Sequence, residues 1–209
     1  MPLKLLIATN NRHKLEEFQE ILANLPLTIT YPAAEGIHLE PAETGATFAE
    51  NAIIKARAFA QASGLLTLAD DSGLEIDALG GEPGVYSARY GHTAKDDHVG
   101  RYQLVLAKLA AKNAPWAERT ARFRCVVALA TRKQLVGTAQ GTVEGFIAYE
   151  PKGDNGFGYD PIFFLPAFNQ TLAEMTSAQK HNISHRARAT RAAIPLLEQF
   201  LKAIDKQGR

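Results

Sequence analysis

The chain has 209 residues, of which 46% are hydrophobic, and its 23 basic and 22 acidic residues give a net charge of +1 with histidine neutral. This length and apolar fraction fit one folded domain with a substantial core and exclude a disordered or collagen-like chain. The near-neutral charge argues against a general nucleic-acid-binding protein, because non-specific affinity for phosphate backbones requires a strong basic surplus.

The apolar runs of the chain are short, and residues 3–8 form one of the longest. A membrane-spanning helix needs roughly 20 apolar residues. The N-terminus also lacks the charged, apolar and small-residue regions of a signal peptide. We therefore expect a cytoplasmic protein that binds no membrane. The one cysteine, Cys125, lies beside the apolar run 126–130, which predicts a buried and unreactive thiol.

The first predicted elements are a strand, a polar loop and a helix. Residues 3–8 are typical of a buried strand, and residues 9–14 (TNNRHK) form the loop. Leucine and phenylalanine residues then recur at helical spacing from Leu15 to Leu25. The alanine-rich residues 48–63 predict a second helix.

The signals at both ends of this second helix are specific. Thr47 and Glu50 have the spacing of a capping box, in which each side chain bonds the backbone of the other residue. Gly64 stands where a helix commonly ends in a left-handed glycine. A short buried strand is predicted next, over residues 65–69, and Asp70 and Asp71 follow it directly.

The second half of the chain is dominated by strand patterns. A helix is predicted over residues 96–112 and a hairpin of strands over residues 123–131 and 134–145. A further strand is expected over residues 162–165. Helical spacing resumes near Ser184, and Pro195 should kink that helix or divide it in two.

These patterns predict an α/β fold with a mixed central sheet flanked by helices. Helices and strands alternate in the first third of the chain, and hairpin-like strands follow. No repeat or linker interrupts residues 1–209, so a single domain is expected. The glycine-rich residues 80–84 are the weakest candidate boundary between lobes.

The loop at residues 9–14 is a candidate phosphate-binding site. It supplies hydroxyl, amide and ammonium donors at a helix N-terminus, where backbone N–H groups and the helix dipole favour an anion. It lacks the glycines of a P-loop, and no dinucleotide-binding fingerprint precedes the helix. The alternative is that Asn10 and Asn11 are turn residues and that Lys14 is simply solvated.

Asp70 and Asp71 are candidate ligands of a hard cation. Adjacent carboxylates at the C-terminal end of a strand point in different directions, so one can bind a metal while the other reaches a different ligand, and open α/β sheets place ligands at those strand ends. Oxygen ligands without cysteine or histidine favour Mg²⁺ or Mn²⁺ over Zn²⁺. The alternative interpretation is an Asx turn.

Two later segments could recognise a base. Phe157 and Tyr159 stand among glycines in the loop 153–160, where they could stack on a base or anchor the loop in the core. His185 and Arg186 could donate to a keto oxygen or a phosphate.

Together these segments resemble the inosine triphosphate pyrophosphatase family, the dITP/XTP (nonstandard purine) nucleoside triphosphate pyrophosphatases. The resemblance covers nearly the whole chain, and several long motifs in the right order make it specific. The motifs are TNNRHK at 9–14, ETGATFAENAIIKA at 43–56, DDSGLEIDALGGEPGVYSARY at 70–90, GFGYDPIF at 156–163 and SHR at 184–186.

The resemblance implies an elongated mixed-sheet fold in two lobes, with the active site in the cleft between them, and a homodimer. It implies Mg²⁺-dependent hydrolysis of a purine nucleoside triphosphate between its α and β phosphates, which yields the monophosphate and pyrophosphate. Such an enzyme removes deaminated purines from the nucleotide pool and so keeps them out of DNA and RNA.

The resemblance also assigns roles to residues. Glu43 and Asp71 match the metal ligands, and Asp71 is also the expected proton acceptor for the attacking water. The predicted substrate-binding residues are Thr9, Asn10, Asn11, Arg12, His13, Lys14, Lys55, Asp70, Ser72, Phe157, Gly158, Tyr159, Asp160, Lys180, His185 and Arg186.

The chemistry of the base agrees with this assignment. Hypoxanthine and xanthine present a keto acceptor at position 6, which suits a donor such as Arg186, whereas adenine presents an amino donor. An unpaired buried donor costs about 1–3 kcal/mol, or roughly one to two orders of magnitude in affinity. This excludes ATP but not GTP, which also has a 6-keto group.

Three alternative functions are also compatible with the sequence. A Maf-type pyrophosphatase for pyrimidine or modified nucleotides would share the fold and the chemistry, but the SHR and GFGYD segments argue against it. A non-catalytic nucleotide sensor would bind without turnover. RNA binding by the basic C-terminal segment would predict steep salt dependence, and the segment lacks interleaved aromatic residues.

Overall fold

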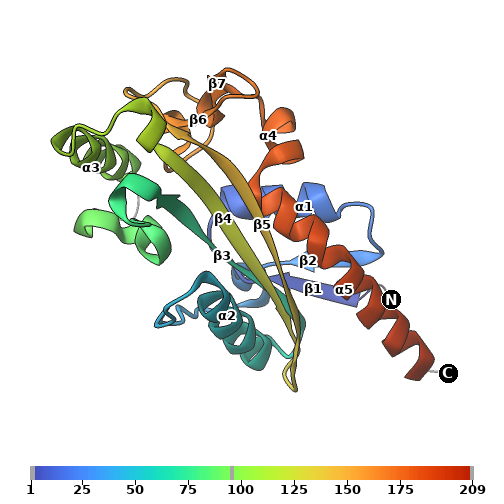
Figure 1. Ribbon diagram of the computed structural model, residues 1–209. Helices are drawn as coiled ribbons and strands as arrows, with labels where there is room; N and C mark the ends of the chain where they lie inside the picture. Colours follow the sequence, from blue (N-terminus) through green and yellow to red (C-terminus); the bar gives the residue numbers. More distant parts are fainter. Residues whose placement is uncertain (1–2, 95–96, 208–209) are drawn as a thin grey trace. The chain divides into compact units, whose positions relative to one another are not determined.

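The computed structural model describes residues 3–94 and 97–207 (Figure 1). Within these residues, strands join in the order β2-β1-β3-β4-β5-β6-β7. The strands are β1 (Leu3–Ile7), β2 (Leu27–Thr30), β3 (Leu66–Ile76), β4 (Thr120–Ala130), β5 (Leu135–Ile147), β6 (Phe163–Leu165) and β7 (Gln170–Thr171). The helices are α1 (Arg12–Leu22), α2 (Phe48–Ser63), α3 (His98–Ala111), α4 (Ser177–Ile183) and α5 (His185–Gln207).

The sheet is mixed, as predicted. Strand β1 pairs in parallel with both β2 and β3. Strand β6 pairs antiparallel with β5 and β7. Strands β4 and β5 are neighbours joined only by residues 131–134, and so short a connection requires an antiparallel pair. The expected α/β fold is therefore confirmed.

The chain divides into two compact units that interleave along the sequence. Unit 1 comprises the chain up to Asp71, Cys125–Gly141 and the segment from His185 onward, and unit 2 comprises Ser72–Arg124 and Thr142–Ser184. The chain thus passes between units inside β3, β4 and β5, and once more between α4 and α5. The predicted boundary at residues 80–84 is wrong, because those residues lie within unit 2.

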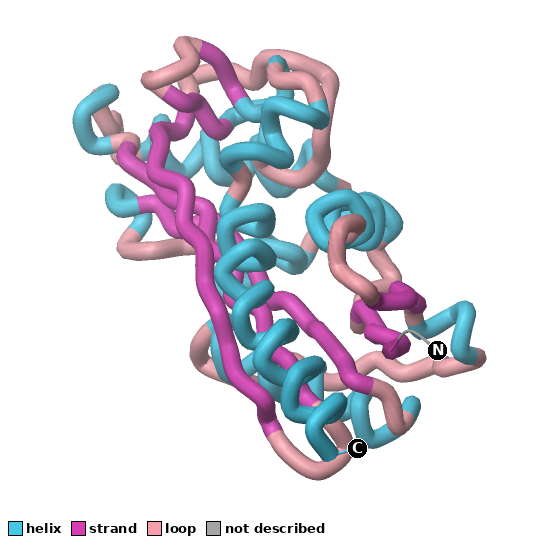
Figure 2. Tube along the Cα trace, turned by 90° about the vertical axis from the view of Figure 1, so that its right-hand side faces the viewer, coloured by secondary structure: helices cyan, strands magenta, loops and turns pink. Residues whose placement is uncertain are grey.

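Unit 1 has its own core, made by one face of its strands together with α1 and α5. Figure 2 shows α5, which ends at the C-terminal marker, lying along the strands. Gly141 of β5 permits this approach, because a Cβ atom there would collide with the backbone of α5 at His185 and Ala189. The buried cluster consists of Leu5, Ile7, Phe18, Leu22, Leu66, Leu68, Cys125, Val127, Leu129, Ala189, Ala193 and Leu197.

Unit 2 buries a second cluster. Leucine and valine residues of α3 join the apolar side chains of the strands and of the segments around β6. Its buried members are Leu74, Ile76, Leu79, Tyr90, Val105, Leu109, Ala114, Ala121, Phe123, Val143, Ile147, Tyr159, Ile162, Phe163, Leu165, Leu172 and Met175.

Most of the predicted elements are present with shifted ends. Helix α2 has the predicted bounds, the capping box of Thr47 and Glu50, and a left-handed Gly64 after its last turn. The hairpin, the strand near residue 163 and helix α3 are also confirmed, although the predicted first residue of α3, position 96, lies outside the described residues. Helix α1 ends at Leu22, so Leu25 lies beyond it.

Two element predictions are wrong. Strand β3 does not end at residue 69 but continues to Ile76, because Asp70 and Asp71 find cationic partners and remain inside the strand. Helix α5 is not divided at Pro195. Pro195 lies on the exposed face of the helix, where water can solvate the carbonyl group that a proline leaves without its hydrogen bond. None of the described helices is both long and apolar enough to cross a membrane.

Candidate active site

The predicted phosphate loop lies where β1 ends and α1 begins. Asn11 caps the helix, because its Oδ1 accepts the backbone N–H of Lys14 at 3.2 Å, and its own N–H donates to Thr9 Oγ1 at 3.1 Å. The first turn of α1 holds no acidic residue and begins with Arg12, His13 and Lys14. The charges of Arg12 and Lys14 add to the positive end of the helix dipole, so the turn favours an anion. Asn10, Arg12 and His13 are exposed, and Arg12 pairs with Glu16 at 2.9 Å.

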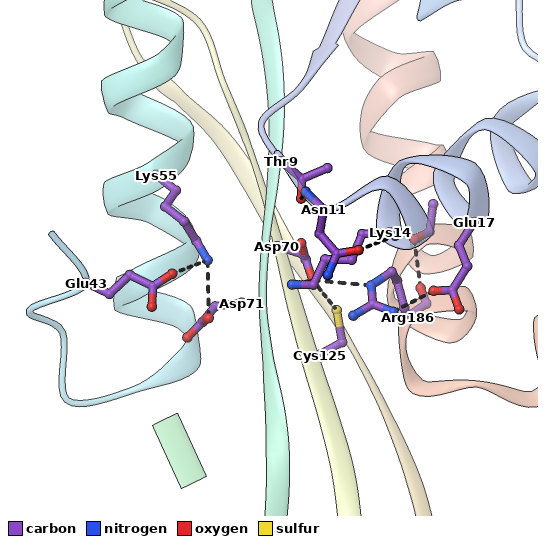
Figure 3. Close-up of polar contacts among 11 residues, drawn as sticks. Thr9, Asn11, Lys14, Glu17, Glu43, Lys55, Asp70, Asp71, Cys125 and Arg186 are labelled. Carbon is purple, nitrogen blue, oxygen red and sulfur yellow. Dashed lines mark hydrogen bonds and ion pairs between the residues drawn. The ribbon is translucent and has the colours of Figure 1, made fainter. Parts of the chain in front are cut away.

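Asp70 and Asp71 lie inside β3 and are 3% and 6% exposed. Successive side chains of a strand point to opposite faces of a sheet. Figure 3 shows this arrangement, with Asp71 facing α2 and Asp70 on the side of α1 and α5. The two carboxylates therefore serve different partners, as expected, but they are not turn residues.

Asp70 is the centre of a buried ion-pair network. Its Oδ2 atom lies 2.9 Å from Lys14 Nζ and 3.3 Å from Arg186 Nε. Arg186, itself 2% exposed, also binds Glu17 Oε2 through Nη1 at 2.5 Å. Burial alone would raise the pKa of Asp70, but the positive charges of Lys14, Arg186 and Lys55 hold it well below its usual value. Asp70 therefore remains ionised and fixes Lys14 beside the loop.

Cys125 adds nothing reactive to this network. Its thiol is fully buried, and Sγ lies 3.9 Å from Asp70 Oδ2. Burial and the negative charge of Asp70 raise the pKa of the thiol. The prediction of a buried, unreactive cysteine is confirmed.

Asp71 belongs to an acidic centre with Glu43 and Lys55. Lys55 Nζ lies 2.7 Å from Glu43 Oε1 and 3.2 Å from Asp71 Oδ1. The second oxygen of Asp71, Oδ2, is buried and has no hydrogen-bond partner in the part of the chain that the structure describes. Burial raises the pKa of Asp71, Lys55 opposes this rise and Glu43 adds to it. Burial would lower the pKa of Lys55, but the surrounding carboxylates raise it.

The acidic centre fits a hard divalent cation. Over the described residues, no group of three or more histidine, cysteine and acidic side chains is placed to hold a metal. Glu43 and Asp71 contact the same lysine, and Mg²⁺ is usually bound by one or two carboxylates, with waters and substrate phosphates completing its shell. The partnerless Oδ2 atom of Asp71 is the observation that fits such an ion.

A second cluster lies within unit 2. Asp160, which is 3% exposed, accepts the backbone N–H of Phe157 at 2.8 Å and binds Lys180 Nζ at 2.6 Å. Lys180 Nζ also lies 4.9 Å from the centre of the Phe157 ring. Gly156 has a φ of +83° and leaves no room for a Cβ atom beside Asp160. The loop is therefore held in one conformation around a buried ion pair.

The other predicted site residues lie in the core of unit 2, in β3 and at the start of α5. Tyr159 is 4% exposed and lies in the core of unit 2, where its hydroxyl donates to the carbonyl of Ser87 at 2.8 Å. Gly158 adopts a left-handed φ of +68°. Ser72 follows Asp71 in β3 and is partly exposed, and His185 is buried at the start of α5.

Within unit 1 the structure thus places the predicted residues in two groups on opposite faces of β3, one around Asp70 and the other around Asp71. The residues are Thr9, Asn11, Lys14, Glu43, Lys55, Asp70, Asp71 and Arg186 (Figure 3). Ser72, Phe157, Gly158, Tyr159, Asp160 and Lys180 belong to unit 2. Glu17 was not predicted, although its spacing of three residues from Lys14 places both on one face of a helix.

The chain is similar over most of its length to proteins of one family. The Ham1 family model matches residues 5–196. The dITP/XTP pyrophosphatase of Bacillus subtilis (strain 168) is 49% identical over 193 residues, which cover 92% of this chain and 96% of that protein. A solved structure of a HAM1 protein from Coxiella burnetii has a TM-score of 0.85 and 42% identity, and the match covers 94% of this chain and 99% of that one. The dITP/XTP pyrophosphatase structure from Mycobacterium abscessus has a TM-score of 0.74 and 39% identity over 92% of this chain and 100% of its own. The predicted resemblance is confirmed, and the chain belongs to the Ham1 family.

Proposed function

We propose that the chain is a nucleoside triphosphate pyrophosphatase. It hydrolyses the nonstandard purine nucleotides ITP, dITP and XTP to the monophosphate and pyrophosphate, and so keeps deaminated purines out of DNA and RNA. The observation that carries the proposal is the acidic centre of Glu43, Lys55 and Asp71, with one buried carboxylate oxygen lacking a partner in the described residues. The names of the Bacillus subtilis and Mycobacterium abscessus relatives support it.

In this proposal the loop at residues 9–14 binds the triphosphate. Its backbone N–H groups and the cationic first turn of α1 face the phosphate oxygens. Lys14 and Lys55 neutralise the charge that develops on the departing pyrophosphate. Asp70 keeps Lys14 in place through their ion pair of 2.9 Å, and Ser72 contacts the substrate.

Glu43 and Asp71 would hold Mg²⁺. A bound Mg²⁺ would neutralise phosphate charge and make an attacking water more acidic. Asp71 is also the proposed proton acceptor for the attacking water.

Base recognition is assigned to the unit 2 cluster and to the start of α5. Phe157 offers a partly exposed aromatic face in a loop that Asp160 and Lys180 hold in shape. Arg186 is the proposed donor to the 6-keto group, and its bonds to Glu17 and Asp70 fix the orientation of its guanidinium group. Asn10, Arg12, His13, Gly158, Tyr159 and His185 complete the proposed substrate-binding set. We also propose a homodimer, which light scattering in solution would test.

The test is pyrophosphate release from ITP, XTP, dITP, GTP and ATP, each with Mg²⁺ and with a chelator. We expect strong Mg²⁺-dependent release from the first three and little from ATP. Equal release from all five would keep the hydrolase and refute the proposed base recognition. Binding of ITP without release of pyrophosphate would instead favour a nucleotide sensor.

A further inference from the structure

Asn51 of α2 is fully buried, with 0% of its surface exposed, and the predicted site does not include it. Its Nδ2 group has no hydrogen-bond partner in the described residues. A buried amide nitrogen in this state carries a desolvation cost of about 1–3 kcal/mol. Such a group in a native protein requires an explanation beyond packing.

The amide oxygen of Asn51 holds the loop that carries Glu43. Oδ1 accepts the backbone N–H of Gly45 at 2.8 Å. The loop lies so close to the helix here that a Cβ atom on Gly45 would be 2.6 Å from Glu50 Cβ and 2.8 Å from Asn51 Oδ1. The side chain of Glu50 accepts the next two backbone N–H groups, those of Ala46 at 2.6 Å and Thr47 at 3.1 Å. The backbone from Gly45 to Thr47 is therefore bound to the first turns of α2.

Asn51 and Lys55 are four residues apart in α2 and thus share one face of the helix. Lys55 binds the Glu43 carboxylate itself, at 2.7 Å. One helix face thus holds the loop at two points: Asn51 holds its backbone at Gly45, and Lys55 holds the side chain of Glu43. Without Asn51, Glu50 would still hold the backbone at Ala46 and Thr47, but Gly45, which is two residues from Glu43, would lose its bond to the helix.

The chemical type of the residue also matters. An aspartate at position 51 would accept the same N–H without leaving a buried amide nitrogen. It would also add a third negative charge to the helix face that serves Glu43 and Asp71, and like charges disfavour the ionised forms. A neutral amide supplies the acceptor without that charge.

We propose that Asn51 is a positioning residue: through its bond to the Gly45 N–H it fixes the Glu43 carboxylate in the acidic centre beside Asp71. The metal-binding consequence of this inference rests on the proposed function, whereas the positioning of the loop does not. Asn51 contacts no reacting atom in this proposal and acts through Glu43.

The experiment compares Asn51→Ala with the wild type in two measurements. Hydrogen exchange of the Gly45 amide, followed by NMR in metal-free protein, reports the loop. Mn²⁺ binding, followed by electron paramagnetic resonance, reports the acidic centre. We expect exchange at Gly45 to become about 10-fold faster or more, and Mn²⁺ to bind about 10–100-fold more weakly, as is typical when a group that orients a metal ligand is lost.

Ser63→Ala is the matched control, because Ser63 accepts the backbone N–H of Leu65 at 3.1 Å from the other end of α2. It should destabilise the helix end while leaving Mn²⁺ affinity and Gly45 exchange within about twofold of the wild type. Asn51→Asp keeps the acceptor and should keep the Gly45 amide protected. If Asn51→Asp loses protection of the Gly45 amide as fully as Asn51→Ala does, the proposed role of the acceptor oxygen is wrong.

If Asn51→Ala does not fold, Gly45→Ala tests the same contact from the loop side, because its Cβ atom forces the loop off the helix. It should show the same faster exchange of the neighbouring loop amides and the same loss of Mn²⁺ affinity. Unchanged Gly45 exchange and Mn²⁺ affinity in a folded Asn51→Ala variant would refute the inference. A wild type that binds no Mn²⁺ would refute the proposed metal site instead, and Gly45 exchange would still decide whether Asn51 holds the loop.

Discussion

Asp70 lies between Lys14 and Arg186, whereas its neighbour Asp71 shares a single lysine with Glu43. The alternation of side chains along β3 thus places two adjacent carboxylates in opposite electrostatic environments. The pKa of Asp70 is lowered and that of Asp71 is raised. Substituting each aspartate by asparagine should therefore change stability in opposite directions.

Asp70→Asn should destabilise the fold by about 3–5 kcal/mol at neutral pH, because it leaves the buried Arg186 and Lys14 with less compensating charge. Urea unfolding measures this loss. A carboxyl with a lowered pKa stabilises the folded state above its unfolded pKa and loses that contribution as pH falls through its folded pKa. The difference from the wild type should thus be full above about pH 4 and shrink in more acidic solution. A difference that is constant down to pH 2 would contradict the ion-pair network.

Asp71→Asn should abolish most of the pyrophosphate release while keeping or raising the melting temperature. The amide cannot accept the proton of water, and it removes a buried charge that Glu43 repels. A raised pKa means that ionisation of Asp71 destabilises the folded state as pH rises above its unfolded value. The gain in melting temperature should therefore be larger at pH 7 than at pH 4. A folded variant with full activity would remove Asp71 from the mechanism.

Arg186→Ala should affect stability as well as base choice. It leaves Glu17 and Asp70 buried without their shared partner, and breaking such a pair costs about 3–5 kcal/mol. If Arg186 donates to the 6-keto group, the preference for ITP over ATP should fall by about 10-fold or more. The ratio of the two kcat/KM values and urea unfolding are the measurements. Arg186→Lys, which keeps the charge but not the forked geometry, is the control, and an unchanged ratio in Arg186→Ala would contradict the proposed donor.

At the residue scale, the sequence could identify the chemical groups but not their pairing. Lys14, Asp70 and Arg186 each belong to a recognisable motif, whereas their contact depends on β1, β3 and α5 meeting in the fold. Glu17 belongs to no motif and stands next to the apolar stripe of α1, so its sequence position does not indicate a role. A buried arginine requires a carboxylate, but nothing in the sequence says which one.

At the scale of elements, the prediction succeeded where local signals decide and failed where tertiary contacts do. Helix α2 was predicted at both ends, because its capping box and its C-terminal glycine act within a few residues. The predicted end of strand β3 at residue 69 is wrong, because carboxylates in a buried strand are favourable only with the lysines that the fold supplies. Pro195 predicts a kink or a division of helix α5, and the division is wrong, because the helix continues through this residue.

Helix α5 provides a test of that tertiary contribution. Ala189, Ala193 and Leu197 bury one face of the helix, which keeps it continuous despite Pro195. Pro195→Ala should restore the missing backbone hydrogen bond on the exposed face and stabilise the protein by about 1–3 kcal/mol. Thermal unfolding measures the gain. Gln199→Ala, one turn later on the same exposed face, should change stability by no more than about 0.5 kcal/mol. Equal stability of Pro195→Ala and the wild type would show that the helix bears no cost at this proline.

At the scale of the whole molecule, the sequence predicted the fold class but not its division into units. Three of the four unit boundaries fall inside β3, β4 and β5, where the strand pattern continues without a change in composition, and the fourth falls between α4 and α5. Glycine-rich segments such as residues 80–84 looked more like a boundary, yet they form turns within one unit. Composition marks flexible linkers, whereas this chain crosses between its units inside strands and at the short junction of two helices.

Metal binding should be visible in the stability of the whole molecule. A ligand that binds only the folded state stabilises it by RT ln(1 + [L]/Kd), which is about 2.7 kcal/mol at 100 times Kd. Mg²⁺ should therefore raise the melting temperature in a concentration-dependent way, and a chelator should reverse the rise. In Glu43→Gln and Asp71→Asn the rise should be largely lost, whereas in Lys152→Gln, which lies in an exposed part of unit 2, it should remain. An equal rise in all three variants would mean that the ion stabilises the protein elsewhere, and the acidic centre would then not be the metal site.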